Sequence, residues 1–387
     1  MSKVTYIDEV DIKNKTVLLR VDFNVSLGLN NTIADDVRIR QTIPTINYLL
    51  KNGDRIIIVS HLGRPKGVVD PKYSLSVVVK RLKEYFPKED VVLCKTPDDV
   101  KKSKKKFMVL ENIRFFPKEK NYSNLFAKEL ASMADVYIND AFGVSHRSDT
   151  SLVGTPKFLP SYGGLLLKKE LEILSKATEN PHRPFVTIIG GAKVSTKANV
   201  IHKLIEISDY ILVGGGLANT FLCAQGVDIG GSFCEYEAVE SARKILSLSK
   251  KNRAILEFPV DAIVADKNFR QMETVKIGEV PKGKSIFDIG PETQACFGNI
   301  IAQARTIIWN GPVGYFENPA FKNGTDFIYY SITENGRATK IVGGGDTLAA
   351  ISRKEYLDKI THISTGGGAM LEYIEKGTLP AIEAIKK

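Results

Sequence analysis

The chain has 387 residues, which is more than one hydrophobic core usually serves, so we expect at least two domains. Its composition of 43% hydrophobic, 25% charged and 9% aromatic residues is that of a folded globular protein and argues against disordered, collagen-like and membrane-spanning proteins. The formal net charge of +10 predicts an anionic partner, which leaves nucleic acid, a membrane surface and phosphorylated metabolites open.

The charge is unevenly distributed along the chain. Residues 1–176 hold 30 basic and 21 acidic side chains, whereas residues 177–387 hold 24 and 23. Glycine shows the opposite bias, with 8 of its 31 residues before position 177 and 23 from there on. Two chemically different halves are therefore expected.

Short, β-branched apolar runs alternate with amphipathic stretches through both halves. This alternation is typical of βαβ units around a parallel sheet, whose buried strands read as continuous apolar runs. We therefore predict two doubly wound α/β domains. The expected strands, in chain order, are 16–21, 55–60, 91–94, 107–110 and 136–138, then 185–189, 210–213, 254–258, 306–309, 340–342 and 362–364.

Residues 154–178 are expected to connect the two domains. The segment TPKFLPSYGG is rich in Pro and Gly, which interrupt regular structure, so we expect it to end the first domain. Leu167, Leu171 and Leu174 follow at helical spacing and predict a helix with one buried face.

The cysteines and the first residues bear on the cellular compartment. The four cysteines are far apart and lack metal-ligand spacing, so neither a disulfide framework nor a zinc site is expected. The first 15 residues contain no apolar targeting segment, and no apolar run has the length of a membrane span. We expect a cytoplasmic protein.

Ligands of open α/β sheets bind beyond the carboxyl ends of the strands. Arginine offers a planar fork of donors to carboxylate and phosphate, so several arginines at one sheet edge would hold a small polyanion. A single arginine of this kind more often forms a surface ion pair, and the inference therefore depends on co-occurrence. Strand ends of the first half carry Asp22, Asn24, His61, Arg64, Arg114, Asp140, His146 and Arg147.

Strand ends of the second half carry glycine clusters instead. Glycine lets the backbone approach a phosphate closely, and a glycine turn that opens a helix directs free N–H groups at an anion. One cluster alone is usually only a turn, but several together predict a nucleotide site, and Asp346 beyond one of them could hold phosphate-bound magnesium. The clusters are IIGGAK, LVGGGLA, WNGPVG, IVGGGDT and STGGGA.

Two nucleotide-binding motifs, the P-loop and the dinucleotide fingerprint, have to be considered. GEVPKGKS at 278–285 matches the P-loop pattern, but the residues that follow predict a strand and a turn where a P-loop requires a helix. The fingerprint G-x-G-x-x-G is absent, which disfavours a dehydrogenase. A nucleic-acid-binding protein is the alternative of another class, because the sequence pI is near 9.2. No aromatic stacking platform supports it, and the lysine run at 101–106 reads as a solvated, mobile loop.

The blocks RVDFNV, SHLGRP, ENIRFF and NDAFGVSHR in the first half, followed by the glycine clusters of the second half, carry a resemblance to a known family. The chain closely resembles the phosphoglycerate kinase family over essentially its whole length. One departure is Ser26, where the family usually has proline after RVDFNV. The resemblance implies two Rossmann-like domains with a cleft between them: residues 1–165 for 3-phosphoglycerate, with a tail from about 376 to 387 packed back on it, a connecting helix at 166–178, and residues 179–375 for the nucleotide. The matching blocks, in family order, are RVDFNV, SHLGRP, ENIRFF, NDAFGVSHR, GGAKVSTK, WNGPVGYFE, GGGDT and STGGGA.

The resemblance also implies a role for each matching residue. Arg38, which alone reads as the start of a surface helix, would act both in catalysis and in substrate binding. Lys193 and Lys197, four residues apart, are expected on one helix face, and Asp346 would contact Mg²⁺. The other implied catalytic residues are Gly344 and Gly367; those around 3-phosphoglycerate are Asp22, Asn24, Arg38, His61, Arg64, Arg114 and Arg147; those around ADP or ATP are Gly191, Ala192, Lys197, Gly215, Asn310, Pro312, Glu317, Gly343, Gly344, Gly345, Asp346 and Thr347.

The family reaction is reversible transfer of the acyl phosphate of 1,3-bisphosphoglycerate to Mg-ADP. The nucleophile of the reverse reaction is a carboxylate, which is ionised at pH 7 because its pKa is about 4, so no general base is needed. The resemblance further implies a monomer, and the residues themselves lead us to expect neither a membrane nor a nucleic-acid partner. It also implies hinge closure, with hinges expected at 154–164 and 364–368.

Overall fold

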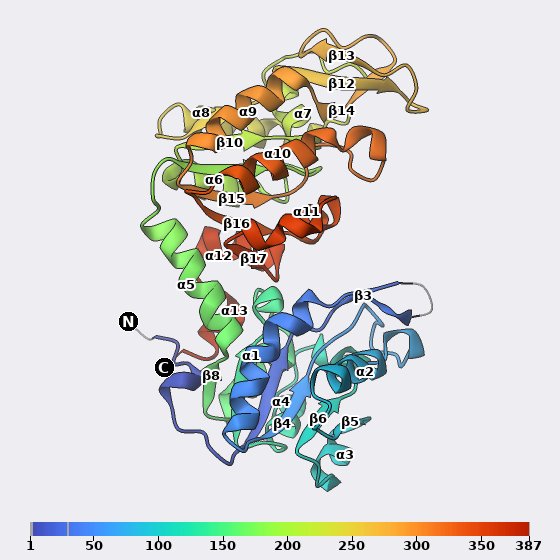
Figure 1. Ribbon diagram of the computed structural model, residues 1–387, viewed down its shortest axis with the longest axis vertical. Helices are drawn as coiled ribbons and strands as arrows, with labels where there is room; N and C mark the ends of the chain where they lie inside the picture. Colours follow the sequence, from blue (N-terminus) through green and yellow to red (C-terminus); the bar gives the residue numbers. More distant parts are fainter. Residues whose placement is uncertain (1–2, 29–30, 387) are drawn as a thin grey trace. The chain divides into compact units, whose positions relative to one another are not determined.

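The structure, a computed structural model, describes residues 3–28 and 31–386. The chain forms two compact units, which we call unit 1 (Met1–Glu172 with Thr378–Lys387) and unit 2 (Ile173–Gly377). Each unit contains a six-stranded parallel sheet with helices packed against it (Figure 1). The predicted class, two doubly wound α/β domains, is confirmed.

The sheet of unit 1 has the order β5-β6-β4-β1-β7-β8, and all five strand pairs are parallel. Five strands lie where the apolar runs predict them. The sixth, β8, falls in the segment expected to end the domain, because its residues Ser161–Gly163 include a serine and a glycine and form no apolar run. The strands are β1 (Thr16–Val21), β4 (Arg55–Val59), β5 (Val91–Cys94), β6 (Phe107–Leu110), β7 (Val136–Asp140) and β8 (Ser161–Gly163).

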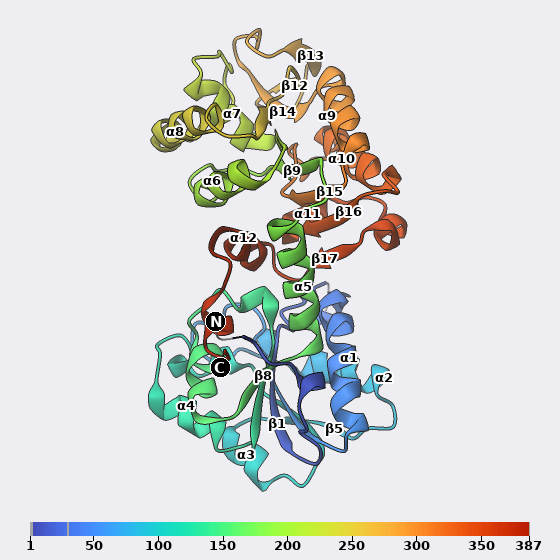
Figure 2. The same cartoon turned by 90° about the vertical axis from the view of Figure 1, so that its left-hand side faces the viewer.

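Helices α1 and α2 cover one face of this sheet, and α4 lies on the other side (Figure 2). Ile39 and Ile46 of α1 and Leu82 of α2 belong to the core between the helices and the sheet. Burial of each such side chain contributes about 1.5–3 kcal/mol. The helices are α1 (Val37–Lys51), α2 (Ser76–Tyr85), α3 (Pro97–Lys102) and α4 (Asn124–Ala131).

The lysine run at 101–106 is only partly a loop. Thr96 and Asp99 form a capping box that starts α3, and Lys101 and Lys102 belong to the last turn of that helix. Cations are favourable at a helix C-terminus, so the prediction of one mobile loop is wrong for these two residues. All five lysines of the run are exposed.

The C-terminal segment of the chain belongs to unit 1. It contains the short helix α13 (Pro380–Glu383), and the N–H of Ala381 donates to the carbonyl of Ser145 at 3.0 Å. Val4 and Lys386 form a β-bridge. A small hairpin of β2 (Ser26–Leu27) and β3 (Ile33–Asp35) completes the unit.

The parallel sheet of unit 2 has the order β11-β10-β9-β15-β16-β17. Numbered within this sheet alone, the order is 3-2-1-4-5-6, that of a Rossmann fold, and it reverses direction between β9 and β15. Crevices at such a reversal are the usual ligand sites of open α/β sheets. The strands are β9 (Phe185–Ile189), β10 (Tyr210–Val213), β11 (Ile255–Glu257), β15 (Thr306–Asn310), β16 (Thr339–Gly343) and β17 (His362–Ser364).

Helices cover both faces of this sheet, with α6, α7 and α8 on one side and α9 and α10 on the other (Figure 2). The face under α9 and α10 is built around Trp309, which is fully buried with Phe297 and Ile328. The helices are α6 (Ala198–Ile207), α7 (Gly215–Ala224), α8 (Val239–Ser249), α9 (Pro291–Gln303), α10 (Asn323–Glu334), α11 (Gly345–Ala350) and α12 (Gly367–Lys376).

A second, antiparallel sheet in unit 2 resolves the P-loop question. It contains β12 (Asp261–Asp266), β13 (Glu273–Lys276) and β14 (Lys284–Ile289). The lysine and serine of GEVPKGKS begin β14, so the match is not a P-loop, as predicted. The turn expected after this strand is wrong: Gly290 is instead the N-cap of α9 and Pro291 its first residue, a position that suits proline.

Helix α5 (Leu165–Glu179) connects the units in sequence, and Leu167, Leu171 and Leu174 are buried along it, as predicted. Its first turn is bound by Asp140, the last residue of β7, whose Oδ1 accepts from the N–H of Leu167 at 3.0 Å. Burial raises the pKa of Asp140 from its ordinary 3.8 to about 7, although the hydrogen bonds it accepts oppose this. No helix among the described residues has the length and apolarity to cross a membrane.

The raised pKa of Asp140 predicts a pH-dependent stability. The folded protein holds the proton between about pH 4 and 7 whereas the unfolded chain does not, so this group's contribution to stability is lost as the pH rises through 7. Asp140→Asn keeps an acceptor but carries no charge. At pH 8.5 we expect its free energy of unfolding, measured by urea denaturation, to exceed that of the parent by roughly 2–4 kcal/mol, and the difference should become smaller at pH 5. Asp135→Asn, one strand length away and exposed, is the control; parallel pH profiles for parent and Asp140→Asn would contradict the assignment.

Candidate functional site

The first candidate site is a cluster of cations at the carboxyl ends of the unit 1 strands. We call it the basic cluster; it comprises Arg20, Arg38, His61, Arg114 and Arg147. Burial lowers the pKa of His61 well below its usual range, and the charges of the four arginines lower it further. His61 is therefore neutral at pH 7, and the positive charge of the cluster resides on the arginines.

Acidic and amide side chains hold this cluster together. Asp22 forms an ion pair with Arg38, and its other oxygen lies 3.7 Å from Nδ1 of His61. Asn24 accepts from the N–H of Gly63 at 2.8 Å, and Nη1 of Arg114 donates to the carbonyl of Gly63 at 2.7 Å. Both side chains thus fix the loop after β4 that carries His61.

Several donors of the cluster are buried without a protein partner. Within residues 3–28 and 31–386, no acceptor reaches Nε and Nη2 of Arg114, and Nδ1 of His61 has no hydrogen-bond partner either. Burial lowers the pKa of Arg114 to about 10, with Arg147 the next largest cause. Buried cationic donors without acceptors are costly unless an anion binds there, so this geometry favours a small anionic ligand.

Arg20 is the part of the cluster that sequence reasoning missed. It lies inside the buried strand β1 with 1% of its surface exposed. Its Nε donates to Oγ of Ser151 at 2.8 Å, and Ser151 donates in turn to the buried carboxylate of Glu119 at 2.7 Å. The sequence contained one signal that could have identified Arg20, namely a charged residue within the otherwise apolar run TVLLRV.

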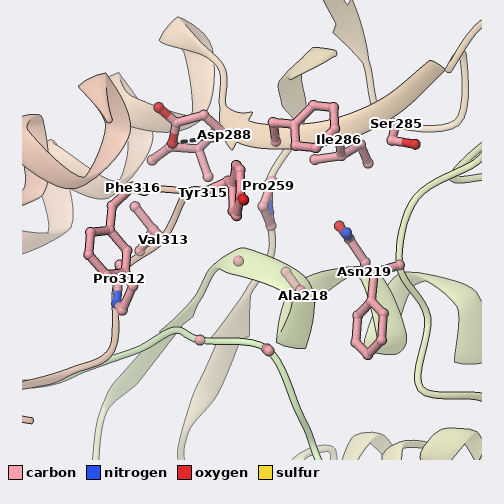
Figure 3. Close-up of a pocket in the computed structure, with 18 of the residues that line it drawn as sticks. Ala218, Asn219, Pro259, Ser285, Ile286, Asp288, Pro312, Val313, Tyr315 and Phe316 are labelled. Atoms are coloured by element: carbon pink, nitrogen blue, oxygen red, sulfur yellow. Dashed lines mark hydrogen bonds between the residues drawn. The ribbon is translucent and has the colours of Figure 1, made fainter. Parts of the chain in front are cut away.

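The second candidate site is a cavity of about 350 Å³ in unit 2 (Figure 3). One wall is apolar and aromatic, with Ile286, Val313 and Tyr315 labelled in Figure 3 around Pro259. A mostly apolar cavity with a few polar groups at its edge is typical of a small-molecule site. Six of the residues implied for the nucleotide line it: Gly191, Ala192, Gly215, Pro312, Glu317 and Asp346.

Beside the cavity, Lys197 joins the ends of the two strands where the sheet order reverses. Its Nζ donates to the carbonyl of Gly190 after β9 at 2.6 Å and to Oδ1 of Asn310 at the end of β15 at 3.0 Å. Burial lowers the pKa of Lys197 to about 8, and the charge of Asp346 opposes this shift. The ammonium group and this carboxylate are therefore close to each other.

The glycine turns form the remaining edge of this site. Asn310 donates to the carbonyl of Gly343 at 2.8 Å, and Thr347 donates to the same carbonyl at 2.9 Å while accepting from Gly311. Gly344 has a φ of +113°, and a Cβ on Gly367 would lie 2.4 Å from its Cα. Only glycine permits this approach, so the two implied catalytic glycines are in backbone contact.

The comparisons with known proteins agree with this architecture. The family model described as Phosphoglycerate kinase matches residues 7–377. Proteins named phosphoglycerate kinase from Pelotomaculum thermopropionicum and Koribacter versatilis are 43% and 45% identical to this chain, over 100% of it and 99% of each relative. The chain belongs to the phosphoglycerate kinase family.

Solved structures of phosphoglycerate kinases have the same fold. The enzyme from Coxiella burnetii superposes with a TM-score of 0.88 at 38% identity and 99% coverage of both chains. The enzyme from Pyrococcus horikoshii gives 0.84 at 31% identity and 98% coverage. Phosphoglycerate kinases are phosphotransferases with a carboxyl acceptor, which sets aside the dehydrogenase alternative.

The structure does not place Lys193, Lys197 and Arg64 as the sequence analysis expected. Lys193 and Lys197 do not share a helix face, because both precede α6, whose first residue is Ala198. The backbone around the two lysines is not helical: Gly191 has a φ of +98° and residues 195–197 form a turn. Lys193 is exposed and near Glu235, whereas Lys197 faces Asn310. Arg64 is exposed and, among the described residues, makes no hydrogen bond or ion pair with the basic cluster.

Asp288 is a further residue that the sequence did not indicate. It lines the cavity (Figure 3) and accepts from the N–H of Gly324 at 2.7 Å. A Cβ on Gly314 would lie 2.2 Å from its Oδ1 and one on Gly324 2.3 Å from it, so the chain after β15 and the first turn of α10 pack directly on this carboxylate. Burial raises the pKa of Asp288 to about 7.

Proposed function

We propose that this phosphoglycerate kinase reversibly transfers the acyl phosphate of 1,3-bisphosphoglycerate to Mg-ADP, with the glycerate held in unit 1 and the nucleotide in unit 2. The observation that carries the proposal is the pairing of two different sites on two Rossmann-like units: buried, unpartnered cationic donors in one and an apolar cavity edged by glycine turns in the other. We assign residues 1–165 with the tail from about 376 to 387 to the glycerate, 166–178 to the connecting helix and 179–375 to the nucleotide.

The glycerate binds, in this proposal, to the basic cluster. The unpartnered donors of Arg114 and the neutral ring of His61 would bind phosphate oxygens, joined by Arg147 and Arg64. Asp22 and Asn24 would accept from the hydroxyl group and, through their contacts with Arg38 and Gly63, keep the neighbouring donors in place.

The nucleotide binds, in this proposal, along the unit 2 cavity. The apolar wall suits a purine ring, and the carboxylate of Glu317 at its edge would accept from ribose hydroxyls. Gly343, Gly344 and Gly345 precede or open α11, where free N–H groups would bind phosphate oxygens. Lys197 would contribute positive charge to the phosphates of the nucleotide.

One side chain beside the proposed nucleotide site, Asp346, is suited to bind Mg²⁺. Asp346 is an exposed carboxylate in the first turn of α11, close enough to Lys197 to influence its pKa. Mg²⁺ is commonly bound by one or two carboxylates together with substrate phosphates. When bound, the ion would neutralise charge on the diphosphate, and Asp346 would hold it.

The chemical step needs positioning and charge neutralisation, with no general base. The attacking carboxylate of 3-phosphoglycerate is already ionised at neutral pH. Arg38 and Lys193 would stabilise the moving PO₃ group while the backbone at Gly344 and Gly367 borders it. An acyl phosphate hydrolyses readily, so the two substrates must be brought into line with water excluded, and we propose closure about hinges at 154–164 and 364–368.

We propose a cytoplasmic monomer. All four cysteines are free, which suits a reducing compartment. The cationic excess of the first half is partly used by substrate arginines, so nucleic acid is not proposed as a partner.

Arg38 and Arg40 on α1 give a matched test of the mechanism. Arg38→Ala should lower kcat by about 10²-fold or more, because a charge on the transferring group is lost, with ATP affinity changed less than threefold. Arg40, 55% exposed and paired with Asp36, is the control, and Arg40→Ala should keep near-parent kcat. A coupled assay of ATP formation from 1,3-bisphosphoglycerate measures both; parent-like turnover in Arg38→Ala would defeat the assignment.

Lys197 predicts a pH dependence of nucleotide binding. Because its pKa is about 8, it is charged at pH 7 and largely neutral at pH 9, so calorimetry should show ATP affinity decreasing over this range. Lys197→Met should bind ATP about tenfold more weakly at pH 7 and lose this pH dependence. Lys203→Met, which removes a solvent-accessible lysine on α6, is the control and should retain the pH dependence of ATP binding. An unchanged pH dependence in Lys197→Met would refute the role of Lys197 in nucleotide binding.

Closure predicts a change of size in solution. X-ray scattering should give a smaller radius of gyration with 3-phosphoglycerate and a non-hydrolysable Mg-ATP analogue together than with either alone. If the value with both ligands equals that of the free protein, the proposed hinges do not operate.

A further inference from the structure

Two cysteines of unit 2 lie next to each other beside the cavity. Cys223 is in the last turn of α7, and Cys234 is in the segment that returns along this helix. Cys223 is one of the groups that raise the pKa of Cys234, so the two thiols are close, and both side chains belong to one apolar cluster with Leu222 and Ile229.

A backbone contact holds the two segments in this register. The N–H of Glu235 donates to Oγ1 of Thr220 at 3.0 Å. Thr220 and Cys223 are three residues apart on α7 and therefore lie on one face of the helix. Fixing residue 235 over Thr220 places Cys234 over Cys223 without dependence on the thiols themselves.

The two thiols differ in their access to solvent. Cys223 is partly exposed, whereas Cys234 is 8% exposed. Burial, followed by the hydrogen bond with Cys223, raises the pKa of Cys234 to about 12. A reagent in solution would therefore meet Cys223 first, and Cys234 is placed to react second.

We propose that Cys223 and Cys234 form a reversible disulfide, with a low-molecular-weight disulfide as oxidant, and that this bond weakens nucleotide binding in unit 2. The second part rests on the nucleotide site proposed above. Disulfides of cytoplasmic proteins are usually transient and redox-sensing, which fits a pair that is reduced in the resting state.

The chemistry balances with that oxidant. The thiolate of Cys223 attacks one sulfur of the small disulfide, forms a mixed disulfide and releases one small thiol. Cys234 then loses its proton and attacks the sulfur of Cys223, which releases the second small thiol. Two protein thiols are oxidised and one small disulfide is reduced to two thiols.

The Cys223–Cys234 disulfide would change the shape of the cavity through the residues that precede the two cysteines in sequence. Leu222 and Phe233 line the cavity. Phe233 is half exposed, and its ring packs near Gly216, where a Cβ would lie 3.2 Å from Cδ1 of the ring. Sulfurs of a disulfide are only about 2.05 Å apart, so we infer that closing the pair draws the two segments together and moves Phe233, the residue next to Cys234.

The test first counts thiols, independently of any activity. The full-length protein is incubated with oxidised glutathione, denatured and titrated, and its peptides are mapped by mass spectrometry. We expect two thiols to be lost, a peptide that links Cys223 to Cys234, and full reversal by dithiothreitol. A stable glutathione adduct on Cys223 beside a free Cys234 would overturn the proposal.

The second measurement is the dissociation constant for ADP by calorimetry, before and after oxidation. Oxidation should raise it about three- to tenfold, the loss expected when one aromatic contact is weakened. Cys223→Ser and Cys234→Ser should abolish the response, whereas Cys296→Ser, at an exposed position on α9, should keep it. A linked peptide with unchanged ADP affinity would refute the effect on the cavity; failure of the reduced protein to bind ADP would instead refute the nucleotide site.

Discussion

The site in unit 2 depends on a close approach between two backbone segments, the one after β9 and the one after β15, where the strand order of the sheet reverses. A Cβ on Gly190 would lie 2.1 Å from the carbonyl oxygen of Pro312, so no other residue fits there. The approach lets Gly190 donate to Asn310 at 3.0 Å and Gly191 to Pro312 at 2.9 Å, which extends the pairing of β9 and β15 beyond the strands. Lys197 then donates to the carbonyl of Gly190 left at this edge. The glycines thus position a lysine, in addition to any phosphate they bind.

Unit 1 solves a different problem, the burial of like charges. Arg20, His61 and Arg114 are all less than 10% exposed, and removing such groups from water is costly. Part of the cost is offset by Glu119, which reaches Arg20 through Ser151, and by Asp22. His61 contributes by staying neutral. The donors of Arg114 that remain unpartnered are the residual cost, and an anion would relieve it.

Local pattern was sufficient for all but β8 of the strands in the two parallel sheets, because buried parallel strands are continuous apolar runs and their carboxyl ends share one edge; β12 and β13 of the antiparallel sheet were not predicted. It failed where an element depends on contacts distant in sequence. Strand β8 has three residues and exists through pairing with β7, and Arg20 is tolerated in β1 only because Glu119 lies nearby. Lys193 and Lys197 have helical spacing, but the turn at 195–197 delays α6. Asp288 is recognisable only once Gly314 and Gly324 are seen to pack on it.

The uneven charge follows from the reaction proposed for the two units. A nucleotide would arrive with magnesium, which neutralises much of its phosphate charge, so backbone N–H groups and Lys197 would be enough to bind it in the proposed site. The glycerate brings a phosphate that does not react and has no metal, so its charge must be met by the protein. Arginines meet it with fixed geometry and remain charged even when buried, whereas a buried lysine loses its proton more easily, as the pKa of about 8 for Lys197 shows. In the proposed assignment, positive charge therefore concentrates in the half that would bind the substrate without a metal, and glycine in the half that would bind the substrate with one.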